Sequence, residues 1–374
     1  MKLSGTPSAD GFHWPAEFDG QVASYMIWPQ RPDNWRNGGK PAQVAFAQIA
    51  AIIARFEPVT MLVNRDQYAN AKAMLPPAVR VVEMSSNDAW MKDYGPFYVV
   101  NDQGERRAVD FQFNAWGGLL DGLYFPWNLD NQVAGKVADL EQTDYYSAGE
   151  TVLEGCAVLT DGQGTLFATE DVVLSEGRNP GGLSKAQAEQ VFHDYLGITK
   201  TIWLPQGYFM DETGGDIDNL LNVVAPGEIV LTWTDDVNDP QHAISEEAYA
   251  LLQRATDARG RHLKIHKLPM PRVLRLSQAE ADQVDRINGD QPRYAGQRLT
   301  ASYVNYLTVN GAILVPEFGD ANDRPAQDLL AQLYPDFQIV GVPSAAVHEV
   351  LTGGGNIHTI MDGVPSLQKS GDGQ

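Results

Sequence analysis

The sequence predicts an α/β protein in which five similar blocks form one closed ring. Two observations support this fold. A fixed order of elements recurs along the 374 residues: a helix, a short strand, a loop rich in glycine or acidic residues, and a β-hairpin. In addition, the fifth block lacks a clear hairpin, and the chain begins with an unpaired strand that could complete it. Chance similarity between the units of an ordinary open α/β sheet is the alternative interpretation.

The first elements are a strand at residues 25–28 and a helix at residues 41–56. The helix is predicted because apolar side chains recur at helical spacing and form one hydrophobic face. That face consists of Ala45, Ile49, Ile52, Ile53 and Phe56. The helices of the five blocks are expected at residues 65–74, 132–140, 184–196, 245–259 and 326–333. The strands after them are expected at residues 80–84, 144–146, 199–204, 262–268 and 338–342.

Four hairpins are expected after the loops, with turns at residues 101–104, 161–162, 226–227 and 310–311. The turn at Asn310 and Gly311 carries the strongest signal, because both residue types tolerate a positive φ between two apolar strands. The ring model places equivalent loops of the blocks near one axis. We therefore expect the polar residues of these loops to meet in a single cavity.

Composition restricts the classes of partner. The chain has 27 Lys and Arg residues against 48 Asp and Glu residues, and its net charge of −21 argues against nucleic acid as a main partner. The acidic surface either keeps the protein in solution or attracts a small cation. No apolar run approaches the ~20 residues of a membrane span, and the first residues lack the apolar core of a signal peptide. A cytoplasmic protein without a membrane partner is expected.

Four of the loops carry acidic or glycine-flanked polar residues. They are Asp88 and Asp93, Glu154, Asp216 and Asp218, and the run Asn356, His358 and Thr359. Carboxylates in one pocket repel each other unless they share a cation, so the pocket suits a guanidinium, an ammonium or a metal ion. Trp90 and Trp116 lie in these regions, and their ring faces could stack on a cation. The alternative is that the acids are solvated turn residues and the tryptophans belong to the core.

The chain resembles the agmatine deiminases nearly from end to end. The resemblance rests on residues 25–29, 31–36, 87–90, 93–96, 113–118, 121–127, 256–258, 266–267, 319–323 and 353–358. It implies the five-bladed α/β propeller, or pentein fold, of the guanidino-group-modifying enzymes, which include the Porphyromonas-type peptidylarginine deiminases. The implied domain covers residues 1–365, and residues 366–374 are expected to form a disordered tail. The chain looks like a divergent second paralogue within this family.

The resemblance also implies a reaction. In the family, a cysteine thiolate attacks the guanidinium carbon of agmatine, ammonia leaves, and water releases N-carbamoylputrescine, without a metal or an organic cofactor. Asp93 and Glu154 match acids that bind the guanidinium, and Asp218 matches the acid of a Gly-His-x-Asp motif. Trp90 and Trp116 are expected to contact the substrate. Agmatine or a similar cation is therefore the expected ligand, and a homo-oligomer or a complex with a paralogue is the expected assembly.

The sequence departs from the family pattern at the residues that carry the chemistry. Thr359 stands at the position of the cysteine nucleophile, and Asp216 stands at the position of the catalytic histidine. A second histidine position holds Leu159. Lys92 replaces a usual arginine, and Asn219 replaces a usual aspartate. A threonine hydroxyl is a weak nucleophile without a base, and the loss of nucleophile or base can lower turnover by on the order of 10⁶.

Three hypotheses follow. The first is an agmatine deiminase by descent with little or no turnover, which binds agmatine or a related cation or regulates an active paralogue. The second is a hydrolase with a remodelled site that uses direct attack by water. The third is a structural or regulatory protein without a ligand. Cys156, the single cysteine, excludes an internal disulfide and is expected to be buried and inert, while His358 is interpreted as structural.

Overall fold

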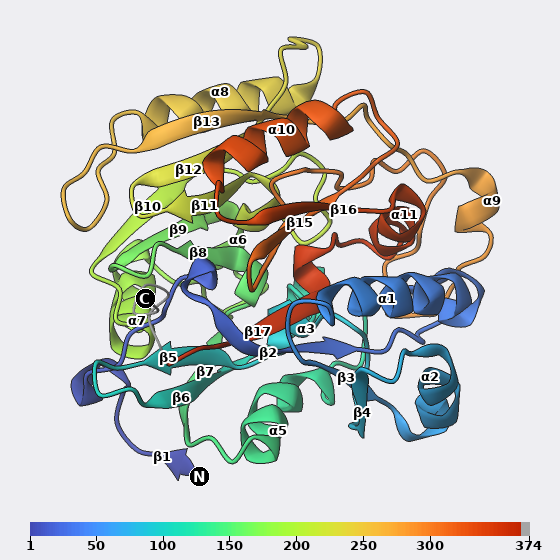
Figure 1. The fold of residues 1–374 in the computed structure, drawn as a ribbon, viewed down its shortest axis with the longest axis horizontal. Coiled ribbons are helices and arrows are strands. Elements are labelled where there is room, and N and C mark those ends of the chain that lie inside the picture. The colour runs from blue at the N-terminus through green and yellow to red at the C-terminus, as the bar shows by residue number, and fades with distance from the viewer. Residues whose placement is uncertain (368–374) are drawn as a thin grey trace.

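The computed structural model describes residues 1–367 and contains five small β-sheets that follow one another in chain order around the molecule (Figure 1). Each sheet has the same plan. An inner strand pairs antiparallel with a second strand, which pairs parallel with a third. Each sheet thus combines an antiparallel pair with one parallel strand, and both kinds of element were predicted from the sequence.

Four of the sheets each take three strands from one stretch of the chain, with the inner strand first, so that each sheet joins the hairpin of one predicted block to the strand of the next block. The first sheet contains β5 (Phe97–Val100), β6 (Arg106–Gln112), β7 (Tyr145–Val152) and the short β1 (Lys2–Leu3). The second contains β8 (Val158–Thr160), β9 (Thr165–Thr169) and β10 (Lys200–Leu204). The third contains β11 (Leu221–Ala225), β12 (Glu228–Trp233) and β13 (Lys264–Pro269). The fourth contains β14 (Leu307–Val309), β15 (Ala312–Pro316) and β16 (Gln338–Val342).

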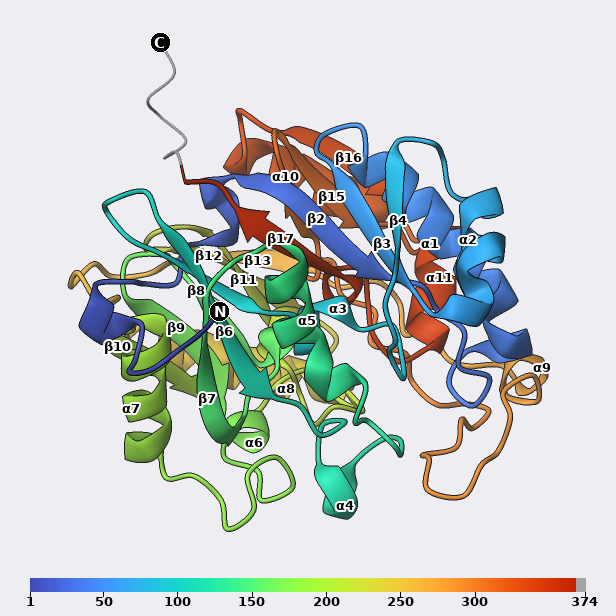
Figure 2. The same ribbon diagram turned by 90° about the horizontal axis from the view of Figure 1, so that it is seen from below.

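The fifth sheet joins the two ends of the described chain. It contains β17 (Met361–Pro365), β2 (Gln21–Ile27), β3 (Val59–Val63) and β4 (Val79–Glu83). Met361 of β17 lies opposite Met26 of β2 in an antiparallel pair, and Figure 2 shows the two strands side by side. The prediction that an N-terminal strand completes the last block is therefore confirmed.

Helices connect the parallel strands of each sheet, because a parallel pair needs a crossover connection. The main helices between the second and third strands of the sheets are α1 (Lys40–Ile53), α5 (Val133–Leu140), α7 (Lys185–Leu196), α8 (Pro240–Leu252) and α10 (Asp323–Leu333). The other α-helices are α2 (Tyr68–Met74), α3 (Met91–Tyr94), α4 (Gly118–Asp121), α6 (Glu170–Val173), α9 (Gln278–Ala281) and α11 (Ser344–Thr352). Short 3₁₀ helices are η1 (Ser8–Asp10), η2 (Glu17–Asp19), η3 (Arg36–Gly39), η4 (Arg65–Gln67), η5 (Asp130–Gln132), η6 (Gly155–Ala157), η7 (Ile217–Asn219) and η8 (His358–Ile360).

Two helix predictions need correction. The helix expected at residues 245–259 is α8, which begins at Pro240 and ends at Leu252. Asp239 sets its start, because the side chain accepts a hydrogen bond of 2.9 Å from the Gln241 N–H and Pro240 occupies the first helical turn. Helix α11 is not predicted by the sequence, and it packs against α1.

The mixed α/β fold of one domain is confirmed, and apolar side chains fill the space between the sheets and the outer helices. On α1, for example, Phe46, Ile49 and Ile53 are completely buried, as the predicted hydrophobic face requires. Among residues 1–367, no helix has both the length and the apolar character needed to cross a bilayer. Most of the tail expected at residues 366–374 lies outside the described residues, which end at residue 367.

Candidate active site

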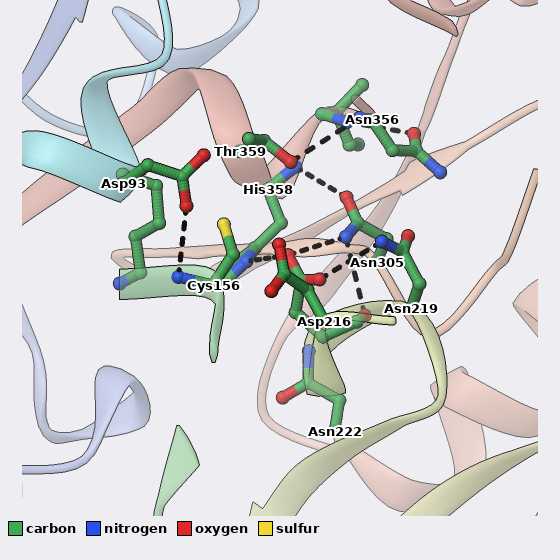
Figure 3. A network of polar contacts seen from close by, with 12 residues as sticks. Asp93, Cys156, Asp216, Asn219, Asn222, Asn305, Asn356, His358 and Thr359 are labelled. Carbon is green, nitrogen blue, oxygen red and sulfur yellow. Dashed lines mark hydrogen bonds and ion pairs between the residues drawn. The ribbon is translucent and has the colours of Figure 1, made fainter. Parts of the chain in front are cut away.

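Four short helical turns meet at the centre of the ring, and each one leads directly into an inner strand. They are α3 before β5, η6 before β8, η7 before β11 and η8 before β17. Helix α3 contacts both η6 and η8, and η6 contacts η7. The repeat therefore places equivalent residues of different blocks side by side. Figure 3 shows Asp93, Cys156, Asp216 and His358 converging from these turns.

The structure brings most of the predicted acids together and buries them. Asp93, Glu154, Asp216 and Asp218 each expose 3% of their surface or less. The pKa of Asp93 is raised to about 8, mainly by burial and in addition by the charges of Glu154 and Asp218. Burial and the neighbouring carboxylates also raise the pKa of Asp216 well above its usual range. The acids thus form one electrostatic unit.

Two oxygens of this unit lack a donor. The Cys156 N–H donates to Oδ1 of Asp93 at 3.3 Å, and Thr213 Oγ1 donates to Oδ2 of Asp216 at 2.8 Å. No nitrogen or oxygen donor of the described residues reaches the other oxygens, Oδ2 of Asp93 and Oδ1 of Asp216. Buried polar atoms normally have partners, so these two oxygens are available to a ligand.

Asp218 has a different environment, because its Oδ2 is already bound. That oxygen accepts from Asn305 Nδ2 at 2.8 Å and lies 2.8 Å from Nδ1 of His358. Asn305 comes from the loop before β14, in the remaining block, and its own Oδ1 accepts from the His358 N–H at 2.9 Å. All five blocks therefore contribute to the centre. The sequence prediction missed Asn305, because its loop has no acidic or glycine signature.

His358 connects the acids to a partly buried ion pair. Its Nε2 lies 2.9 Å from Oε1 of Glu17, and Glu17 also pairs with Lys92. Burial alone would lower the pKa of His358, but the carboxylates of Glu17 and Asp218 raise it to about 9. Burial would likewise raise the pKa of Glu17, but His358 and Lys92 hold it well below its usual range. Glu17 was missed by the sequence prediction because it lies outside the repeated blocks.

Glu154 is held by a residue that the sequence prediction also missed. Nε of Arg178 lies 3.2 Å from Oε1 of Glu154, and both side chains are almost fully buried. Arg178 also donates to the backbone carbonyl of Thr213. The acid that was expected to bind a ligand guanidinium therefore binds a guanidinium of the protein.

The two tryptophans and Thr359 lie together in a neighbouring pocket. Its lining includes Trp90, Trp116, Thr213, Arg293 and Thr359, but none of the four buried acids. The Thr359 hydroxyl accepts a long hydrogen bond of 3.4 Å from the Asn356 N–H. Since Thr213 lines this pocket and also donates to Asp216, it marks the boundary between the pocket and the acids.

Asp88 does not belong to the cavity, which corrects the sequence prediction. Its two oxygens accept from Nε1 of Trp35 at 2.6 Å and from Nε1 of Trp90 at 2.9 Å. Trp35 stacks on Trp90 with ring centroids 4.9 Å apart. Asp88 is therefore a buried hydrogen-bond acceptor that fixes the orientation of the Trp90 ring at the pocket.

Comparisons with known proteins identify the family of the chain. The model of the Porphyromonas-type peptidyl-arginine deiminase family matches residues 13–365. The chain is 54% identical to the Listeria monocytogenes protein named "Putative agmatine deiminase 2", over 97% of this chain and 98% of that one. It is 48% identical to the agmatine deiminase of Pseudomonas syringae pv. syringae, over 98% and 99% of the two chains.

The chain is also similar to an agmatine deiminase of known structure. The agmatine deiminase of Enterococcus faecalis superposes with a TM-score of 0.94 at 46% identity, and the match covers 98% of this chain and 99% of that chain. Identity at this level over the full length shows common family membership as well as a common fold. The chain therefore belongs to the agmatine deiminase family, within the Porphyromonas-type peptidyl-arginine deiminases.

Proposed function

We propose that the protein binds agmatine or a related guanidinium or amine cation at the central acids, and that it hydrolyses this ligand slowly or not at all. The observation that supports binding is the pair of buried carboxylate oxygens without a donor, Oδ2 of Asp93 and Oδ1 of Asp216. A planar guanidinium has forked N–H donors that suit two carboxylates. Binding through Asp93 and Asp216 leaves the Glu154–Arg178 pair in place.

The expected loss of turnover follows from the chemistry of the residues at the nucleophile and base positions. At the position of the family cysteine, Thr359 offers a hydroxyl that is hardly ionised near pH 7. At the position of the family histidine, Asp216 offers a carboxyl with one oxygen bonded to Thr213. No imidazole is then placed to take the proton of a nucleophile or to protonate departing ammonia.

His358 does not replace the missing base. Its ring nitrogens face Asp218 and Glu17, and its raised pKa keeps the ring protonated near neutral pH. A protonated ring bonded on both sides stabilises the surrounding carboxylates, which supports the structural role expected for this residue. A cytoplasmic location, and a homo-oligomer or a paralogue as partner, remain predictions from the sequence.

The proposal is tested by measuring binding and turnover on one purified sample. Titration calorimetry with agmatine, arginine and putrescine should give a saturable heat for at least one of them. Ammonia and N-carbamoylputrescine should stay near background. The Asp93→Asn variant should bind at least about tenfold more weakly, because an asparagine cannot ionise to pair with the bound cation.

Asp194→Asn is the matched control for this substitution, because Asp194 is a carboxylate on α7 that pairs with His193 away from the acids. It should bind like the unmodified protein. Absence of saturable heat with all three cations would refute binding at this site. Rapid hydrolysis of agmatine that disappears in Cys156→Ala would refute the loss of turnover and would make Cys156 the nucleophile.

A further inference from the structure

Three side chains of different chemistry meet beneath the central acids. The Sγ atom of Cys156, a carboxylate oxygen of Asp218 and a ring nitrogen of His358 all lie within 4.8 Å of one another, and all three residues are buried. They come from η6, η7 and η8 of three different blocks. Metal–ligand bonds of about 2.0–2.3 Å in a tetrahedral zinc site place ligand atoms about 3.3–3.8 Å apart. The three atoms therefore need only small shifts to share one ion.

The groups around His358 and Asp218 already have the arrangement of a metal site. His358 turns Nδ1 toward Asp218, at 2.8 Å, while Nε2 bonds to the Glu17 carboxylate at 2.9 Å. Metal-binding histidines usually give their other ring N–H to a carboxylate, which fixes the ring orientation and increases its basicity. Asp218 is fixed in a similar way, since Asn219 and Asn305 donate to its two oxygens.

A second and independent observation points to a missing cation at this cluster. Oδ2 of Asp93 and Oδ1 of Asp216 are buried and have no nitrogen or oxygen donor among the described residues. Both carboxylates lie beside Cys156, as Figure 3 shows. Asp93 and Asp216 therefore offer two further buried oxygens beside the cluster of Cys156, Asp218 and His358.

The donor set selects the kind of ion. A cysteine sulfur and an imidazole nitrogen beside carboxylates suit zinc, whereas magnesium and calcium prefer oxygen ligands alone. We propose that Cys156, Asp218 and His358, with Asp216 or Asp93 as a fourth ligand, form a binding site for zinc or a similar thiophilic divalent cation. Binding displaces one proton from the Cys156 thiol and one from Nδ1 of His358. This site does not depend on agmatine binding.

Zinc and agmatine should exclude each other, because zinc would take Asp216 or Asp93 as its fourth ligand and the guanidinium would bind both carboxylates. The two ideas can therefore be separated on one preparation. Metal-free protein should give the agmatine heat, and protein saturated with zinc should give less. Agmatine binding without zinc binding would overturn only the metal site, and zinc binding without agmatine binding would overturn only the guanidinium site.

The direct test uses cobalt(II) as a spectroscopic probe on full-length protein treated with a chelator. We expect one equivalent of cobalt to give the intense thiolate-to-cobalt charge-transfer band in the near ultraviolet, together with the visible bands of a tetrahedral ion. Zinc added in one equivalent should remove both. Absence of the charge-transfer band in the unmodified protein would overturn the proposal, whatever the variants do.

Variants then assign the ligands. Cys156→Ala should abolish the charge-transfer band, and His358→Gln should weaken cobalt binding at least tenfold. His193→Gln is the matched control, because His193 is an exposed histidine on α7. Circular dichroism checks that each variant is folded. A band that persists in folded Cys156→Ala would place the metal elsewhere and overturn the site.

Discussion

Arg178 and Glu154 form a buried ion pair across the second block, with Nε of Arg178 3.2 Å from the Glu154 carboxylate. One of the acids expected to receive a ligand is thus neutralised by the protein itself. The proposed ligand is therefore expected to bind through Asp93 and Asp216, the two acids that keep an oxygen without a donor. Arg178 is therefore expected to stabilise the folded site and not to contact the ligand.

Removing Arg178 alone should destabilise the protein strongly. Arg178→Met leaves the Glu154 charge buried without a partner, which should lower the free energy of unfolding by about 3–5 kcal/mol. The double variant Arg178→Met with Glu154→Leu should lose much less, because no isolated charge remains. Urea denaturation measures both. Arg324→Met, which breaks an exposed pair with Asp328, is the control and should change stability by less than about 1 kcal/mol.

Restoring the family residues should restore turnover only when they are combined. Thr359→Cys supplies a thiol without its proton-transfer partner, and Asp216→His supplies a base without a nucleophile. The double variant should exceed either single variant by at least about 100-fold, because nucleophile and base act as a unit. Release of ammonia and N-carbamoylputrescine measures this. Equal rates in the double and single variants would show that another feature of the site blocks the reaction.

Leu159→His, the third family position, should damage the fold. Leu159 is 3% exposed on β8 and packs in an apolar cluster with Phe167 and Leu221. A histidine there buries a polar ring among apolar side chains, so the free energy of unfolding should fall by about 2–4 kcal/mol. Leu159→Ile keeps the volume and should cost less than about 1.5 kcal/mol. Urea denaturation measures both variants. Equal midpoints for Leu159→His and Leu159→Ile would contradict the predicted damage to the fold.

Asp130, which is not one of the central acids, should make the stability of the protein depend on pH. This carboxyl is fully buried, and burial is the main factor that raises its pKa to about 7. The folded state therefore holds a proton that the unfolded state releases near pH 4, so this group lowers stability as the pH rises from about 4 to 7.

The comparison of Asp130→Asn with the unmodified protein tests this pH dependence. The asparagine cannot ionise, so its urea midpoint should fall less between pH 5 and pH 8. Asp257→Asn is the control, because Asp257 pairs with Arg261 and its pKa is lowered rather than raised. Parallel pH profiles for Asp130→Asn and the unmodified protein would show that Asp130 does not titrate in this range.

The sequence predicts the block structure well because each block repeats local signals. Apolar periodicity locates α1 and α7, and the Asn310-Gly311 turn locates the hairpin between β14 and β15. Boundaries are less certain where a cap decides them, as Asp239 does for α8. Helix α11 was missed although Ala346, Val347, Val350 and Leu351 recur at helical spacing, because its nine residues form only a short pattern between a strand and a glycine-rich loop.

The candidate site is predicted in part for the same reason. Asp93, Glu154, Asp216 and Asp218 are found because they recur at one position of the repeat. Pairings between blocks carry no such signal, so Arg178, Glu17 and Asn305 were not identified. Asp88 shows the opposite error, because it was predicted to face the cavity. Its loop does lie at the expected position of the repeat, but its oxygens accept hydrogen bonds from two indole N–H groups.

The pairing of β17 with β2 determines when the fifth sheet can form during synthesis of the chain. Strand β2 leaves the ribosome well before its antiparallel partner β17, because the main strands of the other four sheets lie between them in the chain. Until β17 arrives, one side of β2 is an unpaired edge open to other strands. His358 and Thr359 immediately precede β17, so the nascent chain completes the candidate site at the same stage as it closes its fold.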